Sequence, residues 1–152
     1  MAKVDKIDQK ILSELSEDSS ISIPKLAEKI NANSSVVYSR IKRLLKNKLI
    51  ERFTIEVNDK KLGYGVKSLT GINMDSKQRD NVIQELFKIS GVREVSEVTG
   101  RFDILVTMYA KSLNDMYSVV SDDIGKIDGI ISSESFIEMK TRRKQIPYTL
   151  EK

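Results

Sequence analysis

An apolar stripe with helical spacing opens the chain. Between Val4 and Asp18, apolar residues recur at every third or fourth position, and residues with that spacing gather on one side of a helix. Asp5 precedes the stripe and is suited to cap the helix, because its carboxylate can accept hydrogen bonds from the unpaired N–H groups of the first turn. The residues predicted to be buried on this helix are Ile7, Ile11, Leu12 and Leu15.

A second, shorter helix is predicted over residues 22–30. Ser22 stands at its cap position and Pro24 in its first turn, where the missing N–H of proline costs nothing. Asn31 then tolerates a left-handed turn, and Asn33 can cap a further helix. The residues predicted to face inward are Leu26, Ala27 and Ile30.

The third predicted helix, over residues 34–48, contains five basic residues and no acidic one. Its apolar stripe falls at positions i, i+4 and i+7, formed by Val37, Ile41 and Leu44. Polar and basic residues occupy the opposite side. Arg40 lies beside the apolar stripe, so an internal contact and an external one both remain open for it.

Two helices joined by a short turn, the second of them basic, are typical of a helix-turn-helix DNA-binding unit. The second helix of such a unit enters the major groove with its N-terminal residues nearest the base edges. We therefore predict that serines and a tyrosine of the third helix read bases or hold phosphates, and that its basic residues neutralise the DNA backbone. The candidate DNA-binding residues are Ser34, Ser35, Tyr38, Ser39, Lys42, Arg43 and Lys46.

Alternating residues replace the helical spacing after the third helix. Residues 51–57 are rich in β-branched and aromatic residues and predict a strand, which leads into a linker ending in Gly63 and Gly65. Residues 88–98 and 126–136 then resemble one another at a constant offset of 38 residues. In each segment a helix reaches a glycine and a strand begins.

The remaining pattern predicts a ferredoxin-like domain with the element order β-α-β-β-α-β. Strands are predicted over residues 66–74, 92–98, 102–110 and 130–140, and helices over residues 76–89 and 112–127. The residues predicted to be buried on the two helices are Val82, Ile83, Leu86, Phe87, Leu113, Met116, Val120, Ile124 and Ile127.

Both helices of such a domain cover the same sheet face, so the other face stays open. The third strand is apolar on both faces, since Phe102, Ile104, Val106 and Met108 alternate with Leu105 and Tyr109. An open apolar face in a small domain predicts a partner subunit. We expect at least a homodimer, and a larger assembly of such dimers.

The turn between the two middle strands offers candidate ligand contacts. N–H groups around Thr99 and Gly100 can hold a carboxylate, and Asp103 can pair with an ammonium group. Ser133 and Ser135 are two positions apart on the last strand, so they project on one face and can add hydroxyl contacts. These groups suit the two charged ends of an amino acid. A tight turn around the glycine, without any ligand, explains the segment equally well.

Composition narrows the class of protein. The chain has 152 residues, 39% of them hydrophobic, with no cysteine and no histidine. We therefore predict no disulfide, no metal or cofactor and no catalytic site built on those residues. No apolar run is long enough to span a membrane, and no signal peptide is evident, so we expect a cytoplasmic protein.

Charge is distributed unevenly along the chain. Residues 1–62 carry 13 Lys and Arg against 9 Asp and Glu, a net +4, whereas residues 63–138 carry 8 against 12, a net −4. A helix rich in basic residues, taken alone, is also explained as a solvated protein surface without a partner. The short helix before it, the turn and the local charge excess favour a polyanionic partner, double-stranded DNA. Residues 139–152 are again basic, and either the same partner or solvent suits them.

Four stretches together resemble the Lrp/AsnC family, the feast/famine transcriptional regulators. They are "VDKIDQKILSELSED", "KLAEKINANSSVVYSRIKRL", "KLGY" and "VTGRFDILV", and the likeness covers essentially the whole chain. The resemblance implies a winged-type helix-turn-helix, a hinge strand and a ferredoxin-like effector domain, an α+β fold. It also implies dimers that assemble into octamers or similar rings, with an amino-acid effector held between dimers.

The resemblance places Gly100 and Asp103 on the effector-binding turn of the family. Ser133 and Ser135 fall near a pair of hydroxyl residues that are more often threonines in the family. Lys48 stands where the family has a glycine, and we expect Asn47 to take the left-handed turn instead. The domains implied are a helix-turn-helix over 1–50, a hinge strand and linker over 51–65, an effector-binding and oligomerisation domain over 66–145, and a tail over 146–152.

Two other classes of function compete with a regulator. An architectural protein that coats or bends DNA keeps the basic N-terminal part of the chain and treats residues 99–103 as a turn only. An enzyme requires a catalytic constellation, and the chain offers no paired group with a supporting base. The sequence therefore favours a sequence-specific regulator that is not an enzyme.

Overall fold

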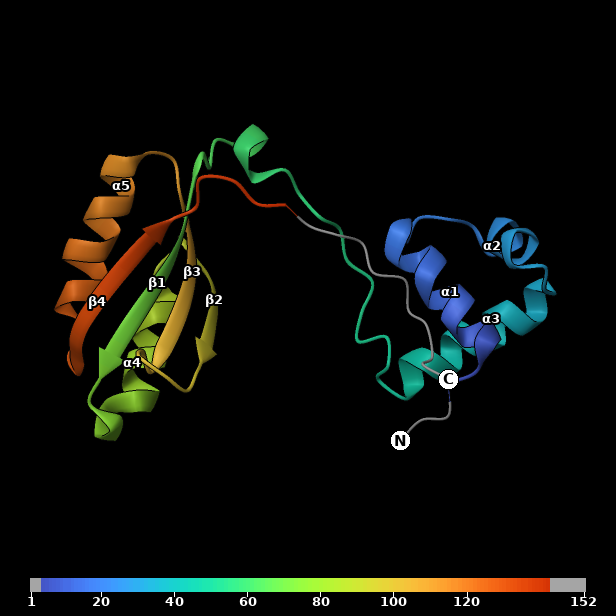
Figure 1. Ribbon diagram of the computed structural model, residues 1–152, viewed down its shortest axis with the longest axis horizontal. Coiled ribbons are helices and arrows are strands. Elements are labelled where there is room, and N and C mark those ends of the chain that lie inside the picture. Colours follow the sequence, from blue (N-terminus) through green and yellow to red (C-terminus); the bar gives the residue numbers. More distant parts are fainter. Residues whose placement is uncertain (1–3, 143–152) are drawn as a thin grey trace. The chain divides into compact units, whose positions relative to one another are not determined.

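The computed structural model describes residues 4–142, which divide into two compact units, a head up to Glu56 and a body over Val57–Thr141 (Figure 1). The head consists of α1 (Lys6–Glu17), α2 (Ile23–Ile30) and α3 (Ser34–Lys46). Its core contains the apolar stripes that the sequence predicts, with Ile7, Leu12, Leu15 and Ile41 only partly buried. The buried residues of this core are Ile11, Leu26, Ala27, Ile30, Val37 and Leu44.

The helix ends of the head follow the sequence with two exceptions. Asp5 caps α1 by accepting hydrogen bonds from two backbone N–H groups, and Asn33 caps α3 through the N–H of Ser35. Ser22 occupies the cap position of α2 without a side-chain hydrogen bond. After α3 the left-handed residue is Lys48, with φ 55°, and not Asn47 as expected. The chain therefore places a lysine where a glycine suits the backbone better.

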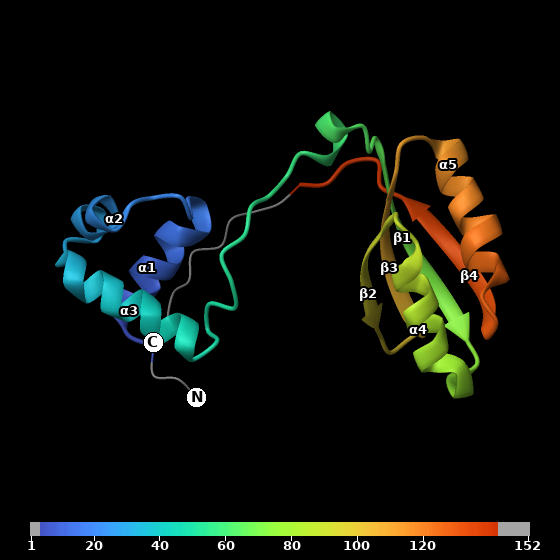
Figure 2. The ribbon, with the colours of Figure 1, turned by 180° about the vertical axis from the view of Figure 1, so that it is seen from behind.

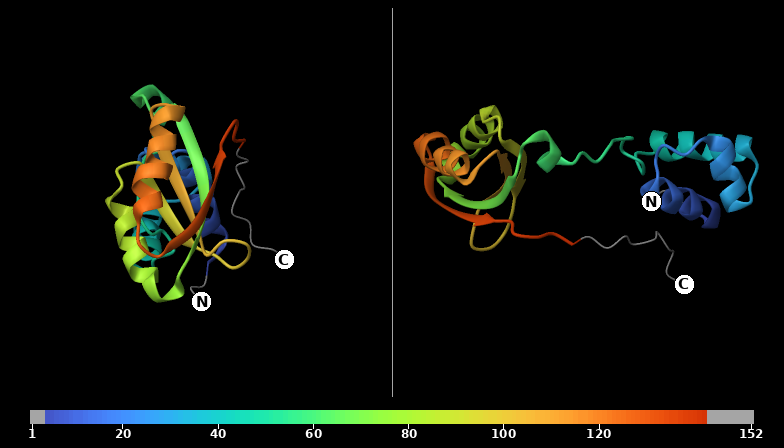
Figure 3. Two further views of the ribbon diagram at one scale, coloured as in Figure 1. Left: turned by 90° about the vertical axis from the view of Figure 1, so that its left-hand side faces the viewer. Right: turned by 90° about the horizontal axis from the view of Figure 1, so that it is seen from above.

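The body is a four-stranded antiparallel sheet in the order β2-β3-β1-β4. Its elements are β1 (Val66–Met74), α4 (Arg79–Lys88), β2 (Val92–Glu97), β3 (Ile104–Ala110), α5 (Leu113–Ser118) and β4 (Ile130–Ile137). A 3₁₀ turn (Ser76–Gln78) precedes α4, and α5 continues through a π-helical turn (Val119–Asp123) and a 3₁₀ turn (Ile124–Lys126). Both helices cover the same face of the sheet (Figures 2 and 3). This is the predicted ferredoxin-like arrangement.

The core of the body lies between that face and the two helices. It contains Ile72 of β1, the inward residues of β3, and Val82, Leu86, Met116 and Ile124 from the helices. Two residues predicted to be buried are in fact exposed, Phe87 by 59% and Leu113 by 60%. Neither belongs to the group of side chains that pack between the sheet and the helices.

The open face of the sheet carries both apolar and charged side chains, and one of the apolar ones is not expected there. Strand alternation predicts Phe102 on the same face as Ile104, yet its ring lies over Gly71 and meets the edge of Phe136, which are both open-face positions. The reason is that β3 begins only at Ile104, so the alternation does not apply to the residues before it. Lys67 and Glu134 share this face with the apolar side chains.

The segment predicted as a hinge strand has no strand pairing in the structure. Residues 51–58 are neither helix nor strand, and a 3₁₀ turn (Asp59–Leu62) follows them. A strand needs a neighbour to accept and donate its backbone hydrogen bonds, and residues 4–142 supply no such strand for this segment. Among the described residues, no helix has the length and apolar character to cross a membrane. The tail over 146–152 lies outside the described residues.

Candidate nucleic-acid interface and effector turn

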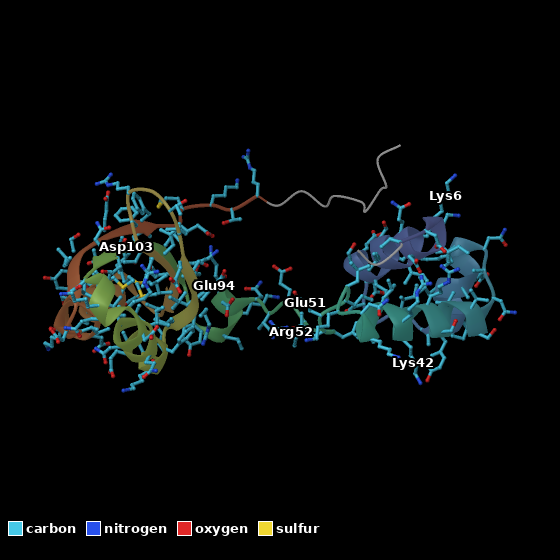
Figure 4. The ribbon with its side chains drawn as sticks, turned by 90° about the horizontal axis from the view of Figure 1, so that it is seen from below. Lys6, Lys42, Glu51, Arg52, Glu94 and Asp103 are labelled. Atoms are coloured by element: carbon cyan, nitrogen blue, oxygen red, sulfur yellow. The ribbon has the colours of Figure 1, made fainter. Side chains whose placement is uncertain are left out.

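All seven candidate DNA-binding residues of α3 are exposed, and all of them except Arg43 lie on its outward side. Tyr38 is 47% exposed, and the Lys42 ammonium nitrogen lies 4.6 Å from the centroid of its ring. This cation–π contact orients two long side chains on the free helix surface. Figure 4 shows Lys42 extending away from α3. Within residues 4–142, no carboxylate pairs with Lys42 or Lys46.

The serine hydroxyls of α3 have a defined hydrogen-bond direction. The Ser35 hydroxyl is 2.8 Å from Asn33 Oδ1, and the Ser39 hydroxyl is 2.9 Å from the Val36 carbonyl oxygen. Each hydroxyl has one hydrogen to donate, and both donate it to an acceptor within the head. Their lone pairs stay available to accept a hydrogen bond from outside, for example from a base amino group.

Arg43 and Arg40 turn toward α1 and meet acidic residues. Nη2 of Arg43 lies 2.5 Å from Asp8 Oδ2, and Nη1 of Arg40 lies 3.2 Å from Asp8 Oδ1. Arg40 also pairs with Asp5. Hydrogen bonding from Arg40 lowers the pKa of Asp5 from 3.8 to about 2, and the same contact raises the pKa of Arg40. Of the two contacts that the sequence leaves open for Arg40, the structure therefore shows the internal one.

The turn between β2 and β3 is held by its own backbone and by Asp103. Gly100 has φ 138°, a conformation that side chains disfavour. The N–H of Val98 donates to the Asp103 carbonyl, and Asp103 Oδ2 accepts the N–H of Met74 at 3.0 Å. One carboxylate oxygen of Asp103 therefore already supports the fold. Thr99 and Gly100 are exposed.

Ser133 and Ser135 do share one face, as predicted, but it is the helix-covered face. Ser133 pairs across the strands with buried Ile72, and the Ser135 hydroxyl is 2.8 Å from that of buried Thr70. The turn residue Phe102 lies over the opposite, open face. Within one chain, the serines and the aromatic part of the turn thus belong to different sides of the sheet.

Two residues near the turn are not anticipated by the sequence. Arg101 Nη2 lies 2.7 Å from Glu134 Oε2, and its guanidinium stacks on the Phe102 ring. Glu134 precedes Ser135 on β4 and therefore projects to the open face. No sequence spacing predicts a contact between Arg101 and Glu134, which are 33 positions apart. The alternation of β4 does predict that Glu134 projects to the opposite face from Ser133 and Ser135.

Comparison with known proteins adds to this geometry. Residues 4–51 match the model of winged helix-turn-helix DNA-binding domains, and residues 68–147 match the model of the Lrp/AsnC ligand binding domain. The chain is 32% identical over 127 residues to the HTH-type transcriptional regulator LrpA of Pyrococcus horikoshii, covering 84% of this chain and 90% of that protein. The chain belongs to the Lrp/AsnC family. The family assignment made from the sequence is confirmed.

Solved structures share the fold of this Lrp/AsnC chain. AsnC of E. coli superposes with a TM-score of 0.86 at 24% identity, covering 95% of this chain and 97% of that one. A transcriptional regulator of Neisseria meningitidis, solved as a complex with L-Met, superposes with a TM-score of 0.90 at 19% identity, covering 97% of each chain. The α+β fold with its two parts is thus confirmed. The chain is a helix-turn-helix transcriptional regulator of the Lrp/AsnC family with a ligand-binding domain, and it is not an enzyme.

Proposed function

We propose that this Lrp/AsnC chain binds specific double-stranded DNA sites as a symmetric dimer, and that a small effector, an amino acid, modulates its DNA affinity or assembly. The observation that carries the proposal is the outward side of α3, which is exposed, polar and basic, with Lys42 and Lys46 unopposed by carboxylates among residues 4–142. Such a chain acts in the cytoplasm, where its DNA lies.

Side chains of α3 would take different roles in the groove. Tyr38 and the acceptor lone pairs of Ser35 and Ser39 are suited to base edges, because a ring can contact a thymine methyl group and a hydroxyl can accept from a base amino group. Ser34 lies at the start of the helix and suits a phosphate. Lys46 suits the DNA backbone, and its contact carries no sequence information.

Two features of the chain support a dimer. Residues 51–58 belong to no strand within residues 4–142, and Phe53, Ile55 and Val57 expose 49%, 81% and 46% of their surface at alternating positions. A second copy running antiparallel would pair the backbone and cover these side chains. The open face of the sheet, with Leu69 and Phe136 exposed, gives a second surface for a partner. Dimers of this kind would pair further into an octamer or similar ring.

A dimer sets the expected form of the DNA site. Two symmetric copies of α3 would enter the major groove about one helical turn apart, roughly 34 Å. The target should therefore be a short inverted repeat. Selection of binding sites from random duplexes tests this directly. Recovery of sequences without a repeated half-site would contradict sequence-specific binding by a symmetric dimer.

The effector part of the proposal rests on the turn around Gly100. Its exposed N–H groups suit a carboxylate, and the second oxygen of Asp103 suits an ammonium group. The Neisseria regulator of similar fold is a complex with L-Met, which favours an amino acid as the ligand class. Ser133 and Ser135 would take part only where a neighbouring copy brings the helix-covered edge of β4 to the turn.

An architectural protein without an effector is the second candidate, because Asp103 already has a structural role at Met74. Calorimetric titration with the twenty amino acids separates the two. Heat from one of them with the wild type, abolished in Asp103→Ala, supports the regulator. No heat from any of them, with either protein, favours the architectural role.

A further inference from the structure

Asp8 is a carboxylate enclosed in the head, with 0% of its side chain exposed. Both of its oxygens are engaged by hydrogen-bond donors. Oδ1 accepts from Arg40, and Oδ2 accepts from Arg43 and from the backbone N–H of Asp5 at 3.1 Å. A buried carboxylate is tolerated only with such partners, because it has given up its hydrating water.

The two arginines come from α3, and Asp8 comes from α1. Arg43 and Asp8 are separated by 35 positions in the sequence. Arg40 and Arg43 stand three positions apart, so they lie on neighbouring turns of one helix side. We call the four residues Asp5, Asp8, Arg40 and Arg43 the acid clamp. It joins the middle of the proposed recognition helix to the first helix.

The acid clamp is electrically balanced, since it holds two carboxylates and two guanidinium groups. Lys42 and Lys46 lie on the other side of α3, and within residues 4–142 neither has a carboxylate partner. A move of Arg43 toward a DNA phosphate would leave the enclosed Asp8 with one guanidinium fewer. The two lysines can meet phosphates without breaking any such ion pair.

We propose that Arg40 and Arg43 are positioning residues, which fix the orientation in which α3 presents Tyr38 to the bases. This inference rests on the proposed DNA-binding function and revises one part of it. Arg43 holds α3 on Asp8, and the phosphate-neutralising cations of α3 are Lys42 and Lys46. A helix held rigidly can select between base sequences, whereas a loosened helix keeps its charge but discriminates less.

The test compares Arg43→Gln with Lys46→Gln in the full chain, since both variants remove one positive charge from the C-terminal half of α3. Binding is measured by fluorescence anisotropy at several KCl concentrations. The probes are a duplex that the wild type selects from random DNA and a scrambled duplex of the same composition. Lys46→Gln should lower the slope of log affinity against log salt by about 0.9 for each phosphate that is no longer neutralised, on both duplexes. Arg43→Gln should leave the slope unchanged and lower the ratio of selected to scrambled affinity about tenfold.

Arg43→Lys provides a second test, in which the positive charge is retained. Lysine keeps the charge but is shorter and ends in a point charge without the planar fork of arginine, so it meets Asp8 with a different reach and geometry. The positioning role predicts an unchanged slope and a reduced affinity ratio. A phosphate contact by residue 43 predicts that slope and ratio both survive. Circular dichroism shows whether each variant is folded. If Arg43→Gln does not fold, the result with Arg43→Lys tests the positioning role.

The outcomes separate this inference from the function on which it rests. A slope that falls as much in Arg43→Gln as in Lys46→Gln overturns the positioning role, while selective binding by the wild type keeps the regulator proposal intact. An affinity ratio that survives in Arg43→Lys overturns it as well. A wild type without any preference for the selected duplex removes the regulator proposal and this inference together.

Discussion

Arg101 Nη2 lies 2.7 Å from Glu134 Oε2, which ties the turn between β2 and β3 to the edge strand β4. The guanidinium also stacks on Phe102, with 5.2 Å between its central carbon and the ring centroid. The Arg101 side chain is 75% exposed and that of Glu134 41% exposed. An ion pair as exposed as this is worth about 0–1 kcal/mol, so a ligand carboxylate can compete for Arg101.

Replacement of Arg101 tests that competition. We expect Arg101→Gln to weaken binding of the effector amino acid about tenfold, because a charge-assisted hydrogen bond is worth about 1.5–3 kcal/mol. Calorimetric titration with the amino acid that gives heat with the wild type measures the change. Glu134→Gln is the control, since it removes the competing carboxylate and should retain or strengthen binding. Equal weakening in both variants would instead indicate a structural role for the ion pair.

A second prediction concerns Lys48, which has φ 55° two residues after the end of α3. A side chain in the left-handed region is strained by about 1–2 kcal/mol, and glycine relieves that strain at some cost in backbone entropy. We expect Lys48→Gly to raise the free energy of unfolding of the head by about 0.5–1 kcal/mol. Urea unfolding followed by circular dichroism measures it. Asn47→Gly is the matched control, because Asn47 has φ −84° and a glycine there should destabilise the head.

The loss of stability of the head at acidic pH should depend on Asp5. Its pKa is lowered from 3.8 to about 2, first by the hydrogen bond from Arg40. A lowered carboxyl pKa adds stability that is complete above the unfolded value of 3.8 and is lost as the pH falls toward 2. We therefore expect Asp5→Asn to be less stable than the wild type near neutral pH. The difference should shrink below pH 4 and vanish near pH 2, in urea unfolding repeated across that range. A difference independent of pH would show that the charge of Asp5 is not its cause, since asparagine caps a helix as well as aspartate does.

Most of the fold follows from local patterns in the sequence. Apolar spacing defines the helices of the head, and the predicted first strand, 66–74, coincides with β1. The errors arise where the burial or the strand pairing of a residue depends on parts of the chain that are distant in sequence. Phe87 has helical apolar spacing but is 59% exposed, and spacing alone does not show which apolar residues the sheet covers. Residues 51–57 have a strand pattern, yet a strand requires a neighbouring strand, and the described part of the chain does not supply one.

The candidate site is likewise predictable where it depends on local geometry and not where it depends on distant contacts. Exposure of Tyr38 and Lys42 follows from their angle around α3, which the apolar stripe fixes. The ion pair between Arg43 and Asp8 spans 35 positions, and no local rule anticipates it. The open-face position of Glu134 does follow from the alternation of β4, but its pairing with Arg101 depends on how the turn folds back.

The last prediction separates base reading from backbone binding on α3. Tyr38 is exposed and oriented by Lys42, whereas Lys46 lies further along the helix with no carboxylate partner among the described residues. Tyr38→Ala should change the preferred base at one position of each half-site, where a good base contact is worth about 1–3 kcal/mol. Lys46→Ala should weaken all sequences alike and lower the salt slope by about 0.9 for each phosphate left without its cation. Site selection from random duplexes and anisotropy at several salt concentrations, run with each variant, measure the two effects. A changed consensus in Lys46→Ala with an unchanged one in Tyr38→Ala would reverse the two roles and place the C-terminal half of α3 in the groove.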